Sequence, residues 1–126
     1  MIFLETSFLI ALYVKKDKHH RKAIEIEKKI RNKQKIINKM VIYEVLTVLR
    51  KKKVSSVDVK KCYNNLINLI VLDDSHYHTQ ALIDSLNNEL GFFDNLHHVL
   101  MIENEISEIA SFDNDFDYFD DIKRVF

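Results

Sequence analysis

The chain has 126 residues, of which 47% are hydrophobic and 30% are charged, as expected for one globular domain spanning residues 1–126. It has no window of 18 uninterrupted apolar residues, so we expect no membrane-spanning helix and no membrane partner. The single cysteine, Cys62, excludes an intramolecular disulfide and favours a cytoplasmic location.

The formal net charge of zero conceals two halves of opposite charge. Residues 1–61 contain 17 Lys and Arg against 6 Asp and Glu, a net charge of +11. Residues 62–126 contain 2 against 13, a net charge of −11. A basic half is suited to binding phosphates and an acidic half to binding a metal ion. The alternative is that the halves attract each other or are solvated surfaces, and the sequence leaves both interpretations open.

In the first half, short apolar runs predict strands, and apolar residues three and four apart predict helices. One Gly and no Pro leave few helix breakers. Ser55 and Asp58 resemble a capping box that starts a helix. The expected elements are a strand at 1–4, a helix at 7–14, a helix from 19 or 20 to 31, a strand at 36–38, a helix at 40–52 and a helix at 55–68.

The second half continues this alternation. Ser75 is expected to cap a helix that runs to about Leu90, and Gly91 to end it as a residue in the left-handed conformation. The other expected elements are a strand at 69–72, a helix at 92–105, a strand at 108–112, a turn at 114–119 and an edge strand at 123–126.

Strands separated by helices imply βαβ crossovers and therefore an α/β fold, with a parallel sheet of four to five strands covered on both faces. In such sheets, ligands bind beyond the carboxyl ends of the strands. Glu5 directly follows the first strand and Asp113 directly follows the fourth. We therefore expect both acids at the same edge of the sheet.

Four carboxylates interrupt or close apolar runs. They are Glu5 in IFLETSFLIAL, Glu44 in VIYEVLTVL, Asp94 in GFFDNLHHVLM and Asp113 in EIASFDNDF. An ionised acid in apolar surroundings costs several kcal/mol unless something neutralises it. No Lys or Arg lies within three residues of any of the four. A cation from outside the chain explains this pattern, and ligands that are all oxygen favour Mg²⁺ or Mn²⁺.

Each acid also has a purely structural interpretation. Glu44 shares a helix face with Val41 and Val48, which predicts a buried acid, and the alternative is a rotated helix with Glu44 at its rim. Asp94 would complement the dipole at the start of its helix.

Asp113 lies in an Asp-Asn-Asp turn, where acids are common. Asp115 and Asp117 share this turn, so which of the three binds a metal ion stays open. Asp113 is favoured because it is nearest to the strand.

The histidines do not have the i, i+4 spacing of a helical zinc site. We interpret them as surface residues, with His97 and His98 at most on the rim of a pocket. The six are His19, His20, His76, His78, His97 and His98.

The segments that contain the four acids resemble the PIN-domain family, specifically its VapC-type toxin ribonucleases, over nearly the whole chain. The family has an Asp followed by Thr or Ser after its first strand, a Glu on an early helix, an Asp at the start of a later helix and an Asp after a strand. The matching positions here are Glu5, Glu44, Asp94 and Asp113. Thr6 and Ser7 occupy the hydroxyl positions. The resemblance implies a three-layer α/β/α fold, Mg²⁺- or Mn²⁺-dependent cleavage of single-stranded or loop RNA, a homodimer and a cognate antitoxin.

One residue departs from the family pattern, because Glu5 stands where the family has Asp. The extra methylene displaces the carboxylate by about 1.5 Å, and Mg²⁺ requires near-ideal octahedral geometry. The alternative function is therefore an attenuated PIN-like protein that binds RNA or a partner without cutting. A third interpretation is an interaction module whose charged surfaces only dock another chain.

The expected mechanism is hydrolysis by a metal-activated water. Glu5, Asp94 and Asp113 would hold the metal ion, and Glu44 would act through a water or a second ion and help to deprotonate the attacking water. Ser7, with Thr6 as a weaker candidate, would position a ligand.

Positive charge must offset the repulsion between RNA and these acids. The candidate segments are Arg50–Lys53 and Lys15–Lys18, with solvated helix ends as the alternative.

Overall fold

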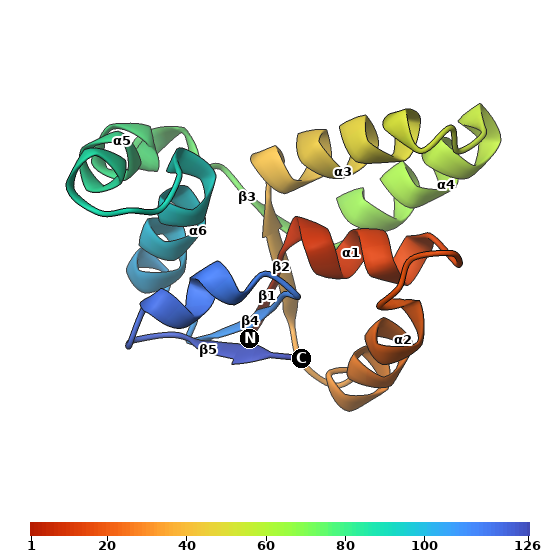
Figure 1. The fold of residues 1–126 in the computed structure, drawn as a ribbon, viewed down its shortest axis with the longest axis horizontal. Coiled ribbons are helices and arrows are strands. Elements are labelled where there is room, and N and C mark those ends of the chain that lie inside the picture. The colour runs from red at the N-terminus through yellow and green to blue at the C-terminus, as the bar shows by residue number, and fades with distance from the viewer.

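Five short parallel strands form the centre of the protein, in a computed structural model that describes residues 1–126 (Figure 1). Their order across the sheet is β3-β2-β1-β4-β5. The predicted parallel α/β fold is therefore confirmed, with the larger of the two expected numbers of strands. The strands are β1 (Ile2–Leu4), β2 (Lys35–Asn38), β3 (Ile70–Leu72), β4 (Glu108–Ala110) and β5 (Lys123–Val125).

Helices cover both faces of this sheet. In the view of Figure 1, the helices within residues 6–67 lie on one side of the strands and those within residues 78–103 on the other, which makes three layers. The first group is α1 (Thr6–Tyr13), α2 (His20–Lys29), α3 (Lys39–Lys51) and α4 (Ser56–Ile67). The second group is α5 (His78–Asn87) and α6 (Phe92–Glu103), and two short 3₁₀ helices are η1 (Ser75–Tyr77) and η2 (Asn114–Tyr118).

The core lies on both faces of β1, which explains why this strand is a continuous apolar run. All three of its residues are at most 2% exposed. Phe8 and Leu49 pack against the sheet from the α1 side, and Leu100 of α6 belongs to the same buried cluster. No helix is both long and apolar enough to span a bilayer.

The order of the strands fixes where a ligand can bind. The chain proceeds from β1 to β2 to β3 in one direction and then returns to place β4 on the other side of β1. This reversal between β1 and β4 is the switch point at which parallel sheets open a crevice beyond the strands' carboxyl ends. Leu4 and Ala110 are paired at these ends, and the Glu5 amide donates to the Ala110 carbonyl at 3.1 Å.

The predicted helix from Ser75 to Leu90 is wrong at both ends. The chain first forms η1, where Asp74 accepts hydrogen bonds from the Met40 amide at 3.2 Å and from the His78 ring at 3.1 Å. The α-helix begins only at His78 and ends at Asn87. Gly91 does not terminate it, because Gly91 is the N-cap of α6, with φ −74°.

The left-handed residues that end helices in this chain are Lys53 and Glu105, with φ of 60° and 57°. After α3, the Lys53 amide donates to the Arg50 carbonyl at 3.0 Å, and the Val54 amide donates to the Leu49 carbonyl at 3.1 Å. This pair of bonds is the Schellman motif, in which glycine is the usual left-handed residue. Two helices therefore stop without the glycine that normally marks such an end.

Candidate active site

Glu5 lies at the carboxyl end of β1 as predicted, and its carboxylate is firmly held. The residue is 9% exposed. Its Oε2 atom accepts hydrogen bonds from the Ser7 amide at 3.0 Å, from the Ser7 hydroxyl and from the Ser111 hydroxyl at 2.7 Å. Burial raises the pKa of Glu5, and the hydrogen bonds from these serines and the proximity of His97 offset part of this rise. Oε1 accepts no hydrogen bond and stays available to a ligand.

Ser111, directly after β4, is a site residue that the sequence analysis missed. It is 1% exposed, and its hydroxyl accepts a hydrogen bond from the Asp113 amide at 3.0 Å while donating to Glu5. The Ser7 hydroxyl accepts from the Phe112 amide at 2.9 Å in the same network. Two serines from distant parts of the chain thus connect the ends of β1 and β4. The only sequence signal was a small polar residue at a strand end.

Three other acids converge at this edge of the sheet. Carboxylate oxygens of Asp94, Asp113 and Asp115 all lie within 4.8 Å of one another, and neither Glu5 nor Glu44 belongs to this group. Burial, followed by repulsion from Asp113 and Asp115, raises the pKa of Asp94 to about 6. The group therefore concentrates negative charge that no Lys or Arg side chain pairs with.

The turn after β4 decides which of its acids joins the group. Asp113 caps η2 by accepting from the Asp115 amide at 2.9 Å, which keeps these two residues together. Asp117 points elsewhere, because Arg124 binds both of its oxygens at 2.9 and 2.8 Å. The hydrogen bond from Arg124 lowers the pKa of Asp117. The geometry therefore groups Asp113 and Asp115 with Asp94 and leaves Asp117 apart.

Asp94 is oriented by its neighbour in the first turn of α6. Asn95 is fully buried, and its Nδ2 donates to the Gly91 carbonyl at 2.9 Å and to the Asn88 Oδ1 at 3.1 Å. These bonds fix the start of the helix, and hence the position from which Asp94 reaches Asp113.

Glu44 is at the rim of the site and is not buried, so that prediction is wrong. The rotated-helix alternative is right about the rim, but it also paired Glu44 with a distant Lys, and no Lys forms a salt bridge with it. Its side chain is 32% exposed. The buried stripe of α3 contains Val41, Val45 and Leu49, which places Glu44 beside the stripe. Glu44 Oε1 accepts a hydrogen bond from the Thr6 hydroxyl at 3.2 Å.

His97 contradicts the interpretation of the histidines as surface residues, because it is 2% exposed. Its Nδ1 atom lies 3.1 Å from Asn38 Nδ2, while Asn38 Oδ1 caps α3 by accepting from the Val41 amide at 3.0 Å. Since the amide nitrogen donates, Nδ1 accepts, and the proton of the neutral ring is assigned to Nε2. Nε2 lies 3.7 Å from Glu44 Oε1. This contact could not be predicted from local patterns, because 59 residues separate Asn38 from His97.

A family comparison agrees with this fold. The PIN domain model matches residues 2–122. The chain belongs to the PIN-domain family. The resemblance found in the sequence is thereby confirmed at the level of the family.

Two solved structures share the fold of this PIN-domain chain. One is Mycobacterium tuberculosis VapC20, described as a sarcin-ricin loop cleaving toxin, with a TM-score of 0.77, 21% identity and coverage of 94% of each chain. The other is PAE2754 from Pyrobaculum aerophilum, with a TM-score of 0.67, 18% identity and coverage of 98% of this chain and 88% of that one. No curated protein matches this sequence.

The acids of this PIN domain suit a hard divalent cation. The donors of the Asp94 group are all carboxylate oxygens, which Mg²⁺ and Mn²⁺ prefer over nitrogen or sulfur ligands. The raised pKa of Asp94 supports the same conclusion. A cation at this position would relieve the repulsion from Asp113 and Asp115, which adds to the effect of burial on this pKa.

Proposed function

We propose that this protein is a metal-dependent endoribonuclease of the VapC type, with Mg²⁺ or Mn²⁺ as its cofactor. The observation that supports this most strongly is the convergence of Asp94, Asp113 and Asp115 at the switch point of a PIN-domain sheet. Carboxylates placed there repel one another and are suited to share a divalent cation.

In this proposal, Asp94, Asp113 and Asp115 would hold the cation, with Glu5 as a further candidate ligand. A bound divalent cation lowers the pKa of water and stabilises negative charge on a phosphate. Glu44 accepts the proton of the attacking water. Its half-exposed carboxylate suits that role, because Thr6 and His97 restrain it from the protein side while solvent reaches the other.

The proposed role of Ser7 is to position a ligand, in line with the expectation from the sequence. Its hydroxyl donates to Glu5 and accepts from the Phe112 amide, so it orients a protein carboxylate. We assign Ser7 and Ser111 as positioning residues for Glu5 and Thr6 as a positioning residue for Glu44.

The proposed substrate is single-stranded or loop RNA, which the fold shared with the loop-cleaving toxin VapC20 supports. A VapC-type toxin would also have a cognate antitoxin that inhibits it, and we propose one here together with a homodimer.

A specific observation also supports the second candidate, a PIN domain that binds RNA without cutting it. Glu5 Oε2 already accepts three hydrogen bonds, and the carboxylate does not belong to the Asp94 group. The longer side chain at this position would then weaken the metal site.

A cleavage assay distinguishes these two functions. The purified protein is incubated with structured RNAs and Mn²⁺, with and without EDTA. Removing one metal-holding carboxylate in Asp94→Asn is expected to reduce cleavage by about 100-fold or more, in proportion to the loss of the metal ion. Asp120→Asn is the matched control, because Asp120 is exposed and makes no hydrogen bond or salt bridge.

The variant Glu5→Asp tests whether the wild-type protein is an active nuclease or an attenuated one. Cleavage by the wild-type protein that EDTA abolishes supports the nuclease. Cleavage that appears only in Glu5→Asp supports the attenuated protein. If neither protein binds Mn²⁺ or cuts any RNA, the nuclease proposal is wrong.

A further inference from the structure

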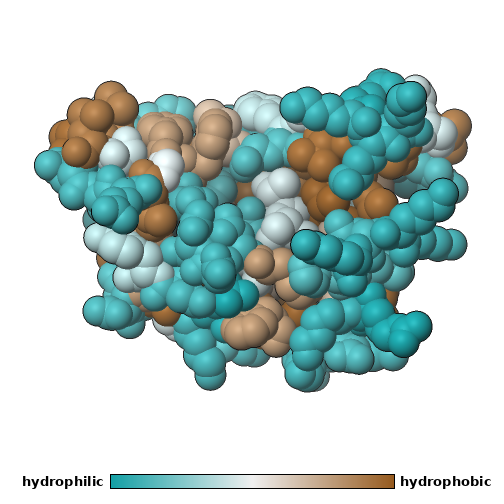
Figure 2. Space-filling view, viewed as in Figure 1, coloured by the Kyte–Doolittle hydropathy of each residue, from teal (hydrophilic) through white to brown (hydrophobic).

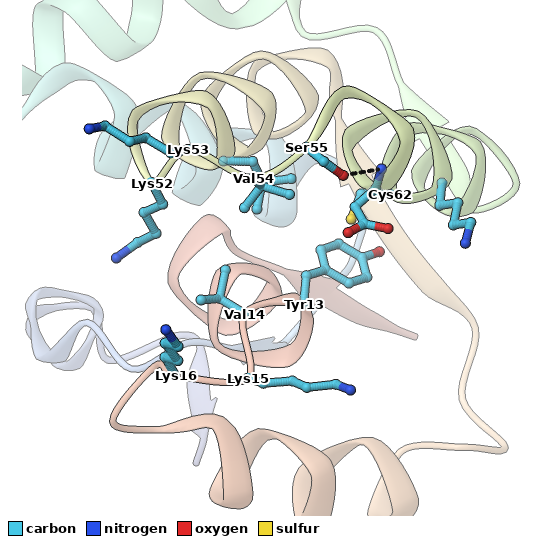
Figure 3. Close-up of a pocket in the computed structure, with 12 residues that line it drawn as sticks. Tyr13, Val14, Lys15, Lys16, Lys52, Lys53, Val54, Ser55 and Cys62 are labelled. Atoms are coloured by element: carbon cyan, nitrogen blue, oxygen red, sulfur yellow. Dashed lines mark hydrogen bonds between the residues drawn. The ribbon is translucent and has the colours of Figure 1, made fainter.

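The two basic segments of the sequence meet in the structure. A cavity of about 670 Å³ lies between the end of α1 and the start of α4 (Figure 3). The loop after α1 contributes two lysines to it, the end of α3 contributes two and α4 contributes one. They are Lys15, Lys16, Lys52, Lys53 and Lys61, which we call the lysine pocket.

The floor of the lysine pocket is apolar and its rim is charged. Tyr13, Val14, Leu49, Val54 and Cys62 line it together with the lysines. In the space-filling view, a hydrophobic area between α3 and α1 is bordered by hydrophilic side chains (Figure 2). The close-up shows the side chains of Lys16 and Lys52 extending toward one another from opposite walls (Figure 3).

None of the five lysines forms a salt bridge. Asp58, in the first turn of α4, is the one acid among the lining residues. Cations do suit helix C-termini, but that effect acts within the last turn of each helix and does not require five cations around one cavity. Five exposed cations around one cavity create a positive potential that an anion from outside would neutralise.

The lysine pocket is not a second catalytic site based on its thiol. Burial, and then the nearby Asp58, raise the pKa of Cys62, which keeps the thiol protonated. The pocket is therefore suited to binding an anion through charge.

Two helices connect this pocket to the acidic site. α1 begins directly after Glu5 and ends at Tyr13, and α3 carries Glu44 at its sixth residue and has Lys52 as its C-cap. At about 1.5 Å per residue, eight residues of helix span about 12 Å. Because that length exceeds the rise of a single nucleotide, a strand that reaches both places must span more than one nucleotide.

We propose that the lysine pocket binds phosphates of the RNA strand away from the bond at the acidic site. This inference rests on the proposed function for its substrate class, and it adds a second contact region that the acids cannot supply. Lysine contacts to phosphate give affinity that is independent of sequence and dependent on salt. An acidic segment of a protein partner is the competing occupant.

The test measures binding without cleavage. A fluorescein-labelled single-stranded RNA of about 20 nucleotides is titrated with protein in EDTA, and fluorescence anisotropy gives Kd from about 0.05 to 0.3 M KCl. The pocket variant is Lys16→Gln/Lys52→Gln, with one lysine from each wall. The matched control, Lys28→Gln/Lys29→Gln, removes the same charge from the exposed end of α2, outside the pocket.

For single strands, the slope of log K against log salt changes by about 0.7 for each phosphate contact. The pocket variant is therefore expected to lose about 1.4 from the slope and to bind about 10-fold or more weakly at about 0.1 M KCl. The control is expected to change Kd by less than about 2-fold. Equal losses in the two variants, or no loss in the pocket variant, would overturn the proposal.

A second arm tests the competing occupant. A glutamate-rich peptide that binds the wild-type protein and loses affinity in the pocket variant, while RNA affinity is unchanged, would assign the pocket to a protein segment and overturn the proposal. Failure of the nuclease is distinguishable from failure of this inference. If the protein cuts no RNA but the pocket variant binds RNA more weakly, the nuclease proposal fails and the lysine pocket proposal stands. If the protein cuts RNA but the pocket variant binds it as tightly as the wild type, the nuclease proposal stands and the lysine pocket proposal fails.

Discussion

The acidic site and the lysine pocket lie at opposite ends of the same two helices, and they hold their charges in different ways. At the acidic site, Glu5 is buried and its Oε2 is fixed by Ser7 and Ser111. At the lysine pocket, the five cations are exposed and form no salt bridge. The first arrangement positions ligands precisely enough for a metal ion, and the second attracts an anion without fixing its geometry.

The two regions differ in how much their side chains contribute to the stability of the fold. Removing a buried partner leaves an unsatisfied polar group, whereas removing an exposed charge leaves only solvent. Substitutions at the acidic end should therefore change both stability and function, and substitutions at the lysine end should change binding alone. Four measurements test this contrast.

Asn38→Ala should have the largest effect on stability. It removes the N-cap of α3, worth about 1 kcal/mol, and leaves the buried His97 Nδ1 without a donor, which costs about 1–3 kcal/mol. The free energy of unfolding in urea should fall by about 2–4 kcal/mol. Asn64→Ala on the exposed face of α4 is the control and should change it by less than about 0.5 kcal/mol. Similar values for the two variants would contradict the buried network.

Metal binding should stabilise the protein through the acidic end only. Mn²⁺ at about 100 times its Kd should raise the free energy of unfolding by about 2.7 kcal/mol, measured by urea titration. Asp94→Asn should lose most of this gain, and Lys16→Gln/Lys52→Gln should keep it. A gain that persists in Asp94→Asn would place the ion elsewhere.

The pH dependence of stability in EDTA should reveal Asp94. Its pKa is about 6 in the folded protein against an ordinary value of 3.8, so the folded state binds more protons between these values. Stability should therefore fall as pH rises from about 4 to about 6 and stay lower above that range. With solvent screening, the loss is about 1–2 kcal/mol. Asp94→Asn should reduce this fall and leave the part that comes from Glu5, whose pKa burial also raises, and Asp120→Asn should leave the fall unchanged.

The smallest expected effect is that of the lysine pocket on stability. Lys16→Gln/Lys52→Gln should change the free energy of unfolding by less than about 0.5 kcal/mol, with a slight gain at low salt because repulsion decreases. Urea titrations at two salt concentrations measure both quantities. A loss above about 2 kcal/mol would mean that these lysines pack as structural residues.

Most of the fold was predictable because its signals are local. The apolar run before Glu5 predicted β1, and Ser55 does cap α4 by accepting from the Asp58 amide at 3.2 Å. The ends of α5 were mispredicted because Gly91 was taken as a stop signal, whereas the stops lie at Lys53 and Glu105. A lysine or a glutamate in the left-handed conformation has no signature in a sequence.

The site was predictable only in part. Glu5 and Asp113 were expected at one sheet edge because strand ends can be inferred from patterns. Ser111 and His97 were not, because their partners are 106 and 59 residues away and only the order of the strands brings them together. The rim position of Glu44 depends on a rotation of α3 that apolar spacing alone did not resolve.

The left-handed Lys53 shows a conflict between backbone preference and charge. A non-glycine residue at φ 60° is less favourable than glycine by about 1 kcal/mol, so Lys53→Gly is the substitution that a protein engineer would choose to make this helix end more robust. The same change would delete one cation of the lysine pocket. Variants of this chain that are selected only for a higher melting temperature should therefore bind polyanions more weakly.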